Sequence, residues 1–237
     1  MINMLNYFGK MQRIARRCSK IAEKELAPAS LRPFYSRRLP DPKARLFDCT
    51  ITCIDFETTG LDFDKDTVIS MGGVSIIDGS INFETAFHRF IKTEGKIAGE
   101  TAVINQITPE QLENQGMDLK EAMMDLMDRL SGSIVLTHCS VIESTFIKRS
   151  LNLPDTFTLP MYFLDTMQIE KTLLKQPSPK ADDVRLAEIR KRRNLPAYEA
   201  HNALADSLAT AEVFLAQVKD IFGKTTPMLD TIYKRSY

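Results

Sequence analysis

Residues 54–61 read Ile-Asp-Phe-Glu-Thr-Thr-Gly-Leu, and this stretch decides how the chain is interpreted. It ends an apolar run, residues 49–54, whose composition and partial alternation predict a β-strand. Asp55 and Glu57 are two residues apart, so on a strand their side chains project from the same face, roughly 7 Å apart at the backbone. Such carboxylates repel each other unless a cation lies between them, and hard oxygen ligands favour Mg²⁺ or Mn²⁺. Taken alone, the pair favours a strand end whose two acids are solvated, so the rest of the chain has to decide.

The composition is that of an ordinary globular protein, with 43% hydrophobic and 26% charged residues in 237. The four cysteines show no Cys-x-x-Cys spacing, which predicts a reducing, cytoplasmic compartment without disulfides or a zinc site. No apolar run approaches the roughly 20 residues of a membrane span, so we expect no membrane partner. We expect three parts: a basic helical arm with a Pro-containing linker (1–45), a main domain (46–222) and a C-terminal tail (223–237).

The charge is divided unevenly along the chain. Residues 1–45 hold eleven Lys and Arg against three acids, a net charge of +8, so the remainder carries −8 because the whole chain sums to zero. A basic arm on an acidic body indicates a body that concentrates carboxylates and an arm able to touch a polyanion.

The arm itself has the apolar spacing of an amphipathic helix over residues 1–26. Three prolines then break the chain into an extended linker: Pro28, Pro33 and Pro40. The arm could pack on the body, pack on a second subunit to give a homodimer, or contact nucleic acid. It also resembles a mitochondrial presequence in being basic, but Glu23 and Glu25 argue against that interpretation.

Strand and helix patterns alternate through the rest of the chain. Strands over 67–77 and 81–92 flank Asp78-Gly79, a strong hairpin signal. A short helix is predicted to open at Thr108-Pro109. Further helices are predicted over 119–130, 143–151, 166–174, 183–193 and 202–219, and further strands over 133–138 and 162–164. This order predicts an α/β fold with a mixed sheet whose first three strands form a meander. Asp165, at the end of the last strand, is assigned to helix capping.

Two other segments carry acids and histidines. His201 and Asp206 are five residues apart; because five helical residues subtend about 140°, we place His201 at or just before the start of the final helix. There it can bend over the site that Asp206 faces. In the middle of the chain, His138 ends a strand and Glu143 opens a helix. By themselves, His201 indicates a surface histidine and Glu143 an acid that favours the helix dipole.

Together, the three segments resemble the DEDDh 3′–5′ exonuclease superfamily, the ribonuclease-H-like group that includes the proofreading epsilon subunit of DNA polymerase III. The resemblance covers about residues 47–220 and rests on Asp-Phe-Glu-Thr-Thr-Gly and on His-x₄-Asp. It implies a mixed five-stranded sheet flanked by helices. The middle motif departs from the family, because Glu143 stands where the family has Asp in a His-Asn-x-x-Phe-Asp context.

The resemblance also implies a role for each site residue. Asp55, Glu57 and Asp206 would hold one Mg²⁺ or Mn²⁺, and Asp55 would bridge to a second ion that Glu143 contacts through water. His201 would be the general base that deprotonates the attacking water. Two divalent ions and a histidine of near-neutral pKa suit phosphodiester hydrolysis.

Substrate contacts follow from the same resemblance. The implied residues are the amides around Thr58 and Thr59 for the 3′-terminal nucleotide, Leu61 for its base, and His138 near the scissile phosphate. The basic run at residues 190–193 suggests either guidance of the phosphate backbone or a solvated helix face.

We therefore expect a metal-dependent 3′–5′ exonuclease that acts on 3′ ends of single-stranded nucleic acid, with DNA favoured over RNA, and releases nucleoside 5′-monophosphates. A polymerase or repair protein is the expected partner. The alternative is a degenerate exonuclease-fold binding module that recruits a nucleic-acid-processing partner through residues 1–45.

Overall fold

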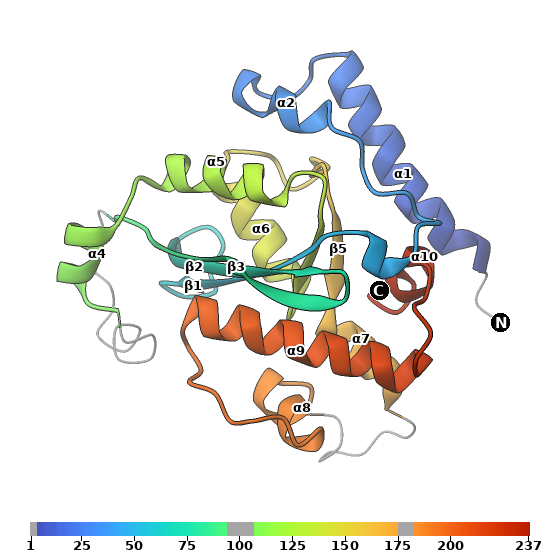
Figure 1. The fold of residues 1–237 in the computed structure, drawn as a ribbon. Helices are drawn as coiled ribbons and strands as arrows, with labels where there is room; N and C mark the ends of the chain where they lie inside the picture. The colour runs from blue at the N-terminus through green and yellow to red at the C-terminus, as the bar shows by residue number, and fades with distance from the viewer. Residues whose placement is uncertain (1–3, 94–106, 175–182) are drawn as a thin grey trace.

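A mixed five-stranded sheet in the order β3-β2-β1-β4-β5 organises the chain (Figure 1). The computed structural model describes residues 4–93, 107–174 and 183–237. The strands are β1 (Ile51–Thr58), β2 (Val68–Ile77), β3 (Ser80–Phe90), β4 (Ile134–Thr137) and β5 (Tyr162–Asp165). β1, β2 and β3 form an antiparallel meander, whereas β4 pairs parallel with β1 and with β5. The predicted fold class, sheet type and meander are confirmed.

The β2–β3 hairpin turns at the predicted residues. Asp78 and Gly79 have φ angles of +52° and +74°. Positive φ at both central residues is what a two-residue turn needs to match the right-handed twist of the strands.

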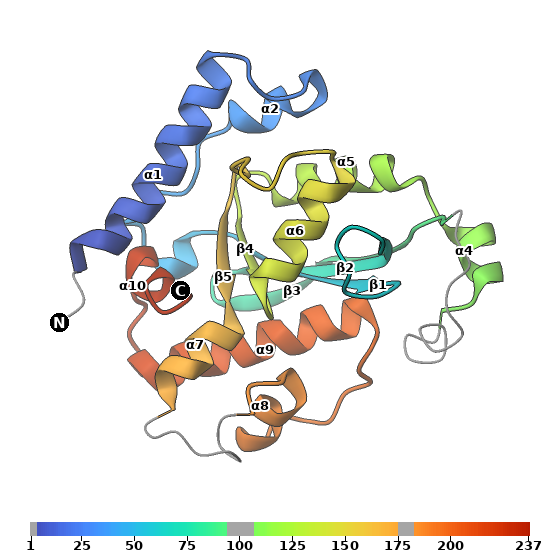
Figure 2. The same cartoon turned by 180° about the vertical axis from the view of Figure 1, so that it is seen from behind.

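Helices cover both faces of the sheet (Figures 1 and 2). On one face lie α1 (Met4–Glu23), α2 (Arg32–Tyr35), α5 (Leu119–Leu130) and α6 (Ser140–Ser150). On the other lie α7 (Thr166–Leu173), α9 (Ala203–Phe222) and α10 (Leu229–Tyr233), with α8 (Leu186–Arg192) outside α9. The remaining described α-helix is α4 (Pro109–Gln115), which is capped as predicted by Thr108.

The pleat of β1 divides its side chains between these two layers. Ile54 and Phe56 belong to the core under α5 and α6, whereas Ile51 and Cys53 belong to the core under α9. Because side chains alternate along a strand, Asp55 and Glu57 point to the α9 side. The sheet register therefore aims both acids of the first motif at the final helix.

The predicted helices are present in the described ranges, but several bounds differ. α9 extends to Phe222, three residues beyond its predicted end. The linker that was predicted to be extended contains the short helix α2. The range predicted for α5 is confirmed, and its Met123 and Met127 are buried as expected of core residues. α6 begins at Ser140, three residues before the predicted start, which puts Glu143 in its first turn. α10 was not predicted, although Leu229 and Ile232 are fully buried.

The arm packs on its own body. Met11 is fully buried, and its carbonyl accepts a hydrogen bond from the Tyr162 hydroxyl at 3.3 Å. The linker also pairs with the C-terminal segment, since the Leu229 amide donates to the Ala44 carbonyl at 2.9 Å. The described part of the apolar stripe that suggested a homodimer, from Met11 to Ala22, is therefore buried or partly buried within one chain. None of the helices in the described ranges is long and apolar enough to cross a membrane.

The close approach of α9 to β2 predicts a specific packing cost. A Cβ at Gly72 would collide with the backbone of Ala203 and Leu204, which cannot move without shifting α9. We expect Gly72→Ala to lower the free energy of unfolding by about 1–3 kcal/mol in urea titrations. Gly9→Ala, a helical position with open space around it, is the matched control and should be neutral or slightly stabilising. Equal stability of the two variants would contradict this packing.

Candidate active site

Three acids converge between β1 and α9. One carboxylate oxygen from each of Asp55, Glu57 and Asp206 lies within 4.8 Å of the other two. Asp206 is on the first turn of α9, and that turn lies against Gly72, the residue paired with Asp55 across β1 and β2. The absent side chain of Gly72 thus allows α9 close enough to bring the first and third motifs together.

Glu143 faces this cluster from α6. Its side chain is buried, and its Oε2 has no hydrogen-bond partner among the described residues. Its negative charge is the largest charge effect on Asp55, after the effect of burial. Glu143 is therefore beside Asp55, although it is not one of the three acids whose oxygens converge.

Burial and repulsion between neighbouring acids raise the pKa of Asp55, Glu57 and Glu143. Burial raises the pKa of Asp55 well above its usual range, and Glu143, Asp206 and Glu57 add to the effect. Burial and the Asp206 charge raise the pKa of Glu57 to about 7. Burial, with a contribution from Asp165, raises the pKa of Glu143 to about 8. An all-oxygen donor set with an unpartnered buried oxygen beside it fits a hard divalent cation such as Mg²⁺ or Mn²⁺.

Asp206 is held by Tyr198, which lies outside the three motifs, and by the backbone of Asn202 within the third motif. The Tyr198 hydroxyl donates to its Oδ1 at 2.8 Å, and the Asn202 amide donates to its Oδ2 at 3.0 Å. The Arg190 guanidinium lies 4.9 Å from the centre of the Tyr198 ring. Arg190 is itself fixed by the Ala209 and Pro196 carbonyls and by the Glu212 carboxylate. This chain of contacts orients the Asp206 carboxylate.

Neither predicted role, phosphate guide or solvated helix face, describes the whole basic run at residues 190–193. Arg190 is only 3% exposed, so neither a phosphate guide nor a solvated face describes it. Arg192 and Arg193 both bond to the buried carboxylate of Glu170, at 3.2 and 2.8 Å. These arginines fasten α8 to the body, because a buried acid such as Glu170 needs paired donors.

Asp165 caps two helices, and the predicted cap is confirmed. Its Oδ1 accepts from the amides of Met167 and Gln168 at the start of α7. Its two oxygens also accept from the amides of Cys139 and Ser140 at the start of α6. Because Asp165 fixes the first residues of α6, it also fixes the backbone position from which the Glu143 side chain extends toward the site.

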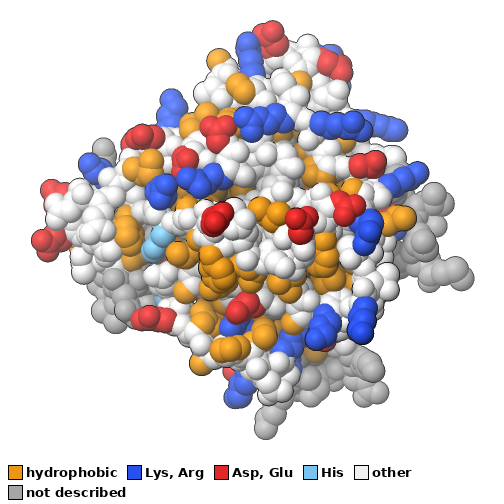
Figure 3. Space-filling model, viewed as in Figure 1, with side chains coloured by type: hydrophobic (Ala, Val, Ile, Leu, Met, Phe, Trp, Pro, Cys, Tyr) orange, Lys and Arg blue, Asp and Glu red, His pale blue; other side chains and the backbone are white. Residues whose placement is uncertain are grey.

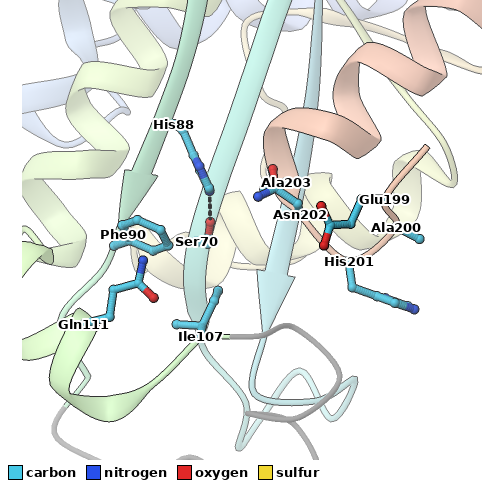
Figure 4. Close-up of a pocket in the computed structure, with 10 residues that line it drawn as sticks. All are labelled: Ser70, His88, Phe90, Ile107, Gln111, Glu199, Ala200, His201, Asn202 and Ala203. Carbon is cyan, nitrogen blue, oxygen red and sulfur yellow. Dashed lines mark hydrogen bonds between the residues drawn. The ribbon is translucent and has the colours of Figure 1, made fainter.

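His201 lies just before α9, as its spacing from Asp206 predicts. It is exposed and has a φ of +65°, a left-handed conformation that is uncommon for a non-glycine residue. Together with Ser70, His88 and Phe90 it lines a cavity of about 190 Å³ (Figure 4). In Figure 4 the His201 ring points away from the His88 and Ser70 side of this cavity.

The cavity adjoins the acids through the sheet register. Glu57 pairs with Ser70, and Ser70 pairs with Phe90, so these three residues share one face of neighbouring strands. His88 Nε2 and Ser70 Oγ are 2.7 Å apart and are hydrogen-bonded (Figure 4). The acid cluster therefore adjoins this cavity on its β3 side.

The proposed substrate residues lie around the ends of β1 and β4. Leu61 is 66% exposed. The Thr59 amide donates to the Thr67 carbonyl at 2.9 Å, and the Thr58 hydroxyl donates to the Gly60 carbonyl at 2.7 Å. His138 Nδ1 and Thr166 Oγ1 are 2.7 Å apart, and burial lowers the His138 pKa.

Sequence reasoning missed Tyr198 and His88 as neighbours of the site. Tyr198 lies in an irregular segment eight residues before Asp206, a spacing with no periodic signal. His88 could have been found from the hairpin register, because the turn at Asp78-Gly79 fixes which residues pair across β2 and β3.

Comparisons with known proteins show the family and agree with this fold. The family model described as Exonuclease (RNase T) matches residues 52–214, which include all three motifs. A PolC-type DNA polymerase III of Thermotoga petrophila is 32% identical over 172 residues, covering 73% of this chain and 12% of that protein. The 3′–5′ exonuclease DinG of Staphylococcus saprophyticus is 26% identical over 162 residues, covering 68% of this chain and 17% of that protein.

Solved structures support the same architecture. An Escherichia coli exonuclease I complex with single-stranded DNA aligns at a TM-score of 0.64 and 15% identity, covering 74% of this chain and 41% of that one. Exonuclease X bound to 5′-overhanging duplex DNA aligns at 0.56 and 20% identity, covering 77% and 99%. The chain belongs to the exonuclease family of ribonuclease-H-like fold, and the resemblance is confirmed at that level. It spans less than a fifth of the PolC-type and DinG relatives.

The raised pKa values predict a pH dependence of stability. The usual pKa of Glu is 4.5, so between about pH 4.5 and pH 8 the folded state holds protons on Glu143 and Glu57 that the unfolded chain has released. The free energy of unfolding should therefore fall as pH rises through this window. We expect the free energy of unfolding, measured by urea titration in EDTA, to fall less between pH 5.5 and pH 8.5 for Glu143→Gln than for the unmodified protein. The exposed-site variant Glu84→Gln should behave like the unmodified protein; an undiminished fall in Glu143→Gln would contradict the prediction.

The Tyr198 contact predicts an effect on metal affinity. Tyr198→Phe keeps the ring on Arg190 but removes the donor to Asp206, and loss of such an outer partner typically weakens metal binding roughly 10-fold or more. Isothermal titration with Mn²⁺ should show this weakening. Tyr237→Phe, which removes a hydroxyl bonded to the Phe163 carbonyl, should leave the affinity unchanged. Equal Mn²⁺ affinities for the two variants would show that Tyr198 does not orient Asp206.

Proposed function

We propose that this protein is a metal-dependent 3′–5′ exonuclease acting on single-stranded nucleic acid and releasing nucleoside 5′-monophosphates, with DNA preferred over RNA. The observation that carries the proposal is the convergence of Asp55, Glu57 and Asp206 oxygens within 4.8 Å. Membership of the exonuclease family supports the reaction class.

Asp55, Glu57 and Asp206 would hold one Mg²⁺ or Mn²⁺, and Asp55 with Glu143 would serve a second ion. Bound divalent ions would supply charge stabilisation for the attacking and leaving oxygens of the phosphodiester. The chain provides the geometry: β1 and α9 present the acids from rigid backbone, and Tyr198 holds the Asp206 carboxylate in one orientation.

His201 would act as the general base. It would take a proton from the water that attacks phosphorus, while the bond from phosphorus to the 3′ oxygen of the preceding nucleotide breaks. Its place on the loop before α9, with an exposed ring, leaves it free to turn toward the acids when substrate arrives. A histidine base of this kind commonly contributes about 10²–10⁴ in rate.

The 3′-terminal nucleotide would lie over the end of β1. Leu61 would pack on its base, because a large apolar side chain is exposed there. The backbone amides around Thr58 and Thr59 would hold the 3′-terminal nucleotide, and His138 would lie near the scissile phosphate. A polymerase or repair protein is the proposed partner, and the cytoplasm the proposed location.

A degenerate binding module is the second candidate. Glu143 in place of the family Asp favours it, since one extra methylene could misplace the second ion. A displacement near 1 Å can cost on the order of 10² in rate.

The exonuclease proposal predicts stepwise shortening of 5′-labelled single-stranded oligonucleotides in Mn²⁺ or Mg²⁺, and none in EDTA. Asp55→Ala should abolish shortening because it removes a ligand shared by both ions. His201→Ala should slow it by about 10²–10⁴. Gel time courses on matched DNA and RNA strands measure both the direction and the preference.

Asp64→Ala is the matched control, since Asp64 is an exposed acid near β1 that pairs with Arg149 rather than with the cluster. It should keep full activity. If Asp55→Ala shortened the oligonucleotides as fast as the unmodified protein, the proposal would be contradicted. Absence of shortening by the folded, unmodified protein, with Mn²⁺ binding also absent, would instead favour the binding module.

A further inference from the structure

α1 carries a stripe of exposed basic side chains. The five residues of this α1 stripe are Arg13, Arg16, Arg17, Lys20 and Lys24. Spacings of three and four residues put them on one face of the helix, over about 16 Å of its axis. None of the five has an ion pair or hydrogen bond to a side chain within the described residues. In Figure 3, Lys and Arg side chains gather over α1 and the linker that follows it.

The opposite face of α1 is already covered. Met11, Cys18 and Ile21 are buried against the body, and the Cys18 thiol lies 3.7 Å from the Leu159 carbonyl, to which it donates. A basic amphipathic helix that binds a membrane surface or a partner groove needs its apolar face for insertion. Because that face is occupied here, α1 presents charge alone, which matches a hydrated polyanion.

The α1 stripe adjoins the helix that leads to the acid cluster. A hollow of about 360 Å³ is lined by Arg17 from α1 and by Ser144 and Lys148 from α6. Ser144 directly follows Glu143 in the first turns of α6. Figure 2 shows α1 and α6 on the same side of the sheet.

We infer that the α1 stripe binds the phosphate backbone of the nucleic acid strand on the 5′ side of the 3′ end that enters the acid cluster. The inference rests on the proposed exonuclease function. Four acids gathered at one site repel a polyanion, so a strand needs cations elsewhere to stay bound. The stripe supplies those contacts without sequence information, since phosphates carry none.

The test measures binding of a 5′-labelled dT20 strand by fluorescence anisotropy, in EDTA, from 50 to 300 mM NaCl. The test variant replaces the five stripe residues with Gln: Arg13→Gln, Arg16→Gln, Arg17→Gln, Lys20→Gln and Lys24→Gln. The charge-matched control replaces five exposed lysines elsewhere: Lys120→Gln, Lys171→Gln, Lys191→Gln, Lys219→Gln and Lys224→Gln. Each phosphate contact on a single strand contributes about 0.7 to the slope of log K against log salt.

We expect the stripe variant to lose about 2 to 3.5 from the magnitude of that slope and at least 10-fold in affinity at 50 mM salt. The slope of the control variant should decrease in magnitude by less than about 0.7, the contribution of one phosphate contact. A stripe variant with the unmodified slope, or a control that loses as much, would overturn the inference. So would loss of binding to phosphatidylserine vesicles in the stripe variant with dT20 binding intact.

Hydrolysis of the p-nitrophenyl ester of thymidine 5′-monophosphate in Mn²⁺ provides the separating readout. This small diester reaches only the acid cluster, so its turnover should be the same in the stripe variant and the unmodified protein, which also shows that the variant folds. Failure of the unmodified protein to cleave the ester or dT20 counts against the exonuclease function. The salt slopes in EDTA still decide whether the stripe binds the strand.

Discussion

Repulsion between buried carboxylates is the constraint on which the site depends. Asp55, Glu57, Asp206 and Glu143 face one region, and burial with mutual repulsion raises the pKa of Asp55 and Glu57. Acids in this position do not gather by attraction, so rigid backbone must hold them there. β1, the first turn of α9 and the first turn of α6 meet that need, and the site that they form carries negative charge that a cation can balance.

Among the described residues, no cationic side chain forms an ion pair with the four acids. Arg190 is buried near the site, but its guanidinium bonds to Glu212 and to backbone carbonyls and reaches Asp206 only through the Tyr198 ring and hydroxyl. An arginine placed directly on Asp206 would neutralise the acid and compete with a cation. Asp165 shows the opposite case, because its oxygens are taken by the amides of two helices. Asp165 thus differs from Glu143, which is equally buried but has one carboxylate oxygen without a donor among the described residues.

The sequence predicted the parts of the site that follow from regular geometry. Asp55 and Glu57 share a face because the strand period is two, and His201 lies outside α9 because five helical residues would turn it away from Asp206. The support of Asp206 by Tyr198 could not be predicted, since it joins an irregular segment to a helix through tertiary packing. The early start of α6 depends on Asp165, which caps it from 25 residues away. α10 has too few residues for a periodic signal and is held by hydrogen bonds to the linker.

The proposed function would also account for the uneven distribution of charge in a chain whose net charge is zero. A protein that binds both a divalent cation and a polyanion needs two surfaces of opposite sign, and each surface would cancel the other if they touched. Screening at physiological salt has a length of about 8 Å, so separation by one layer of helices suffices. α1 achieves this by burying its apolar face on the body while its cations stay in water. Under the proposed function, the acid cluster would bind metal and the α1 stripe would bind phosphate.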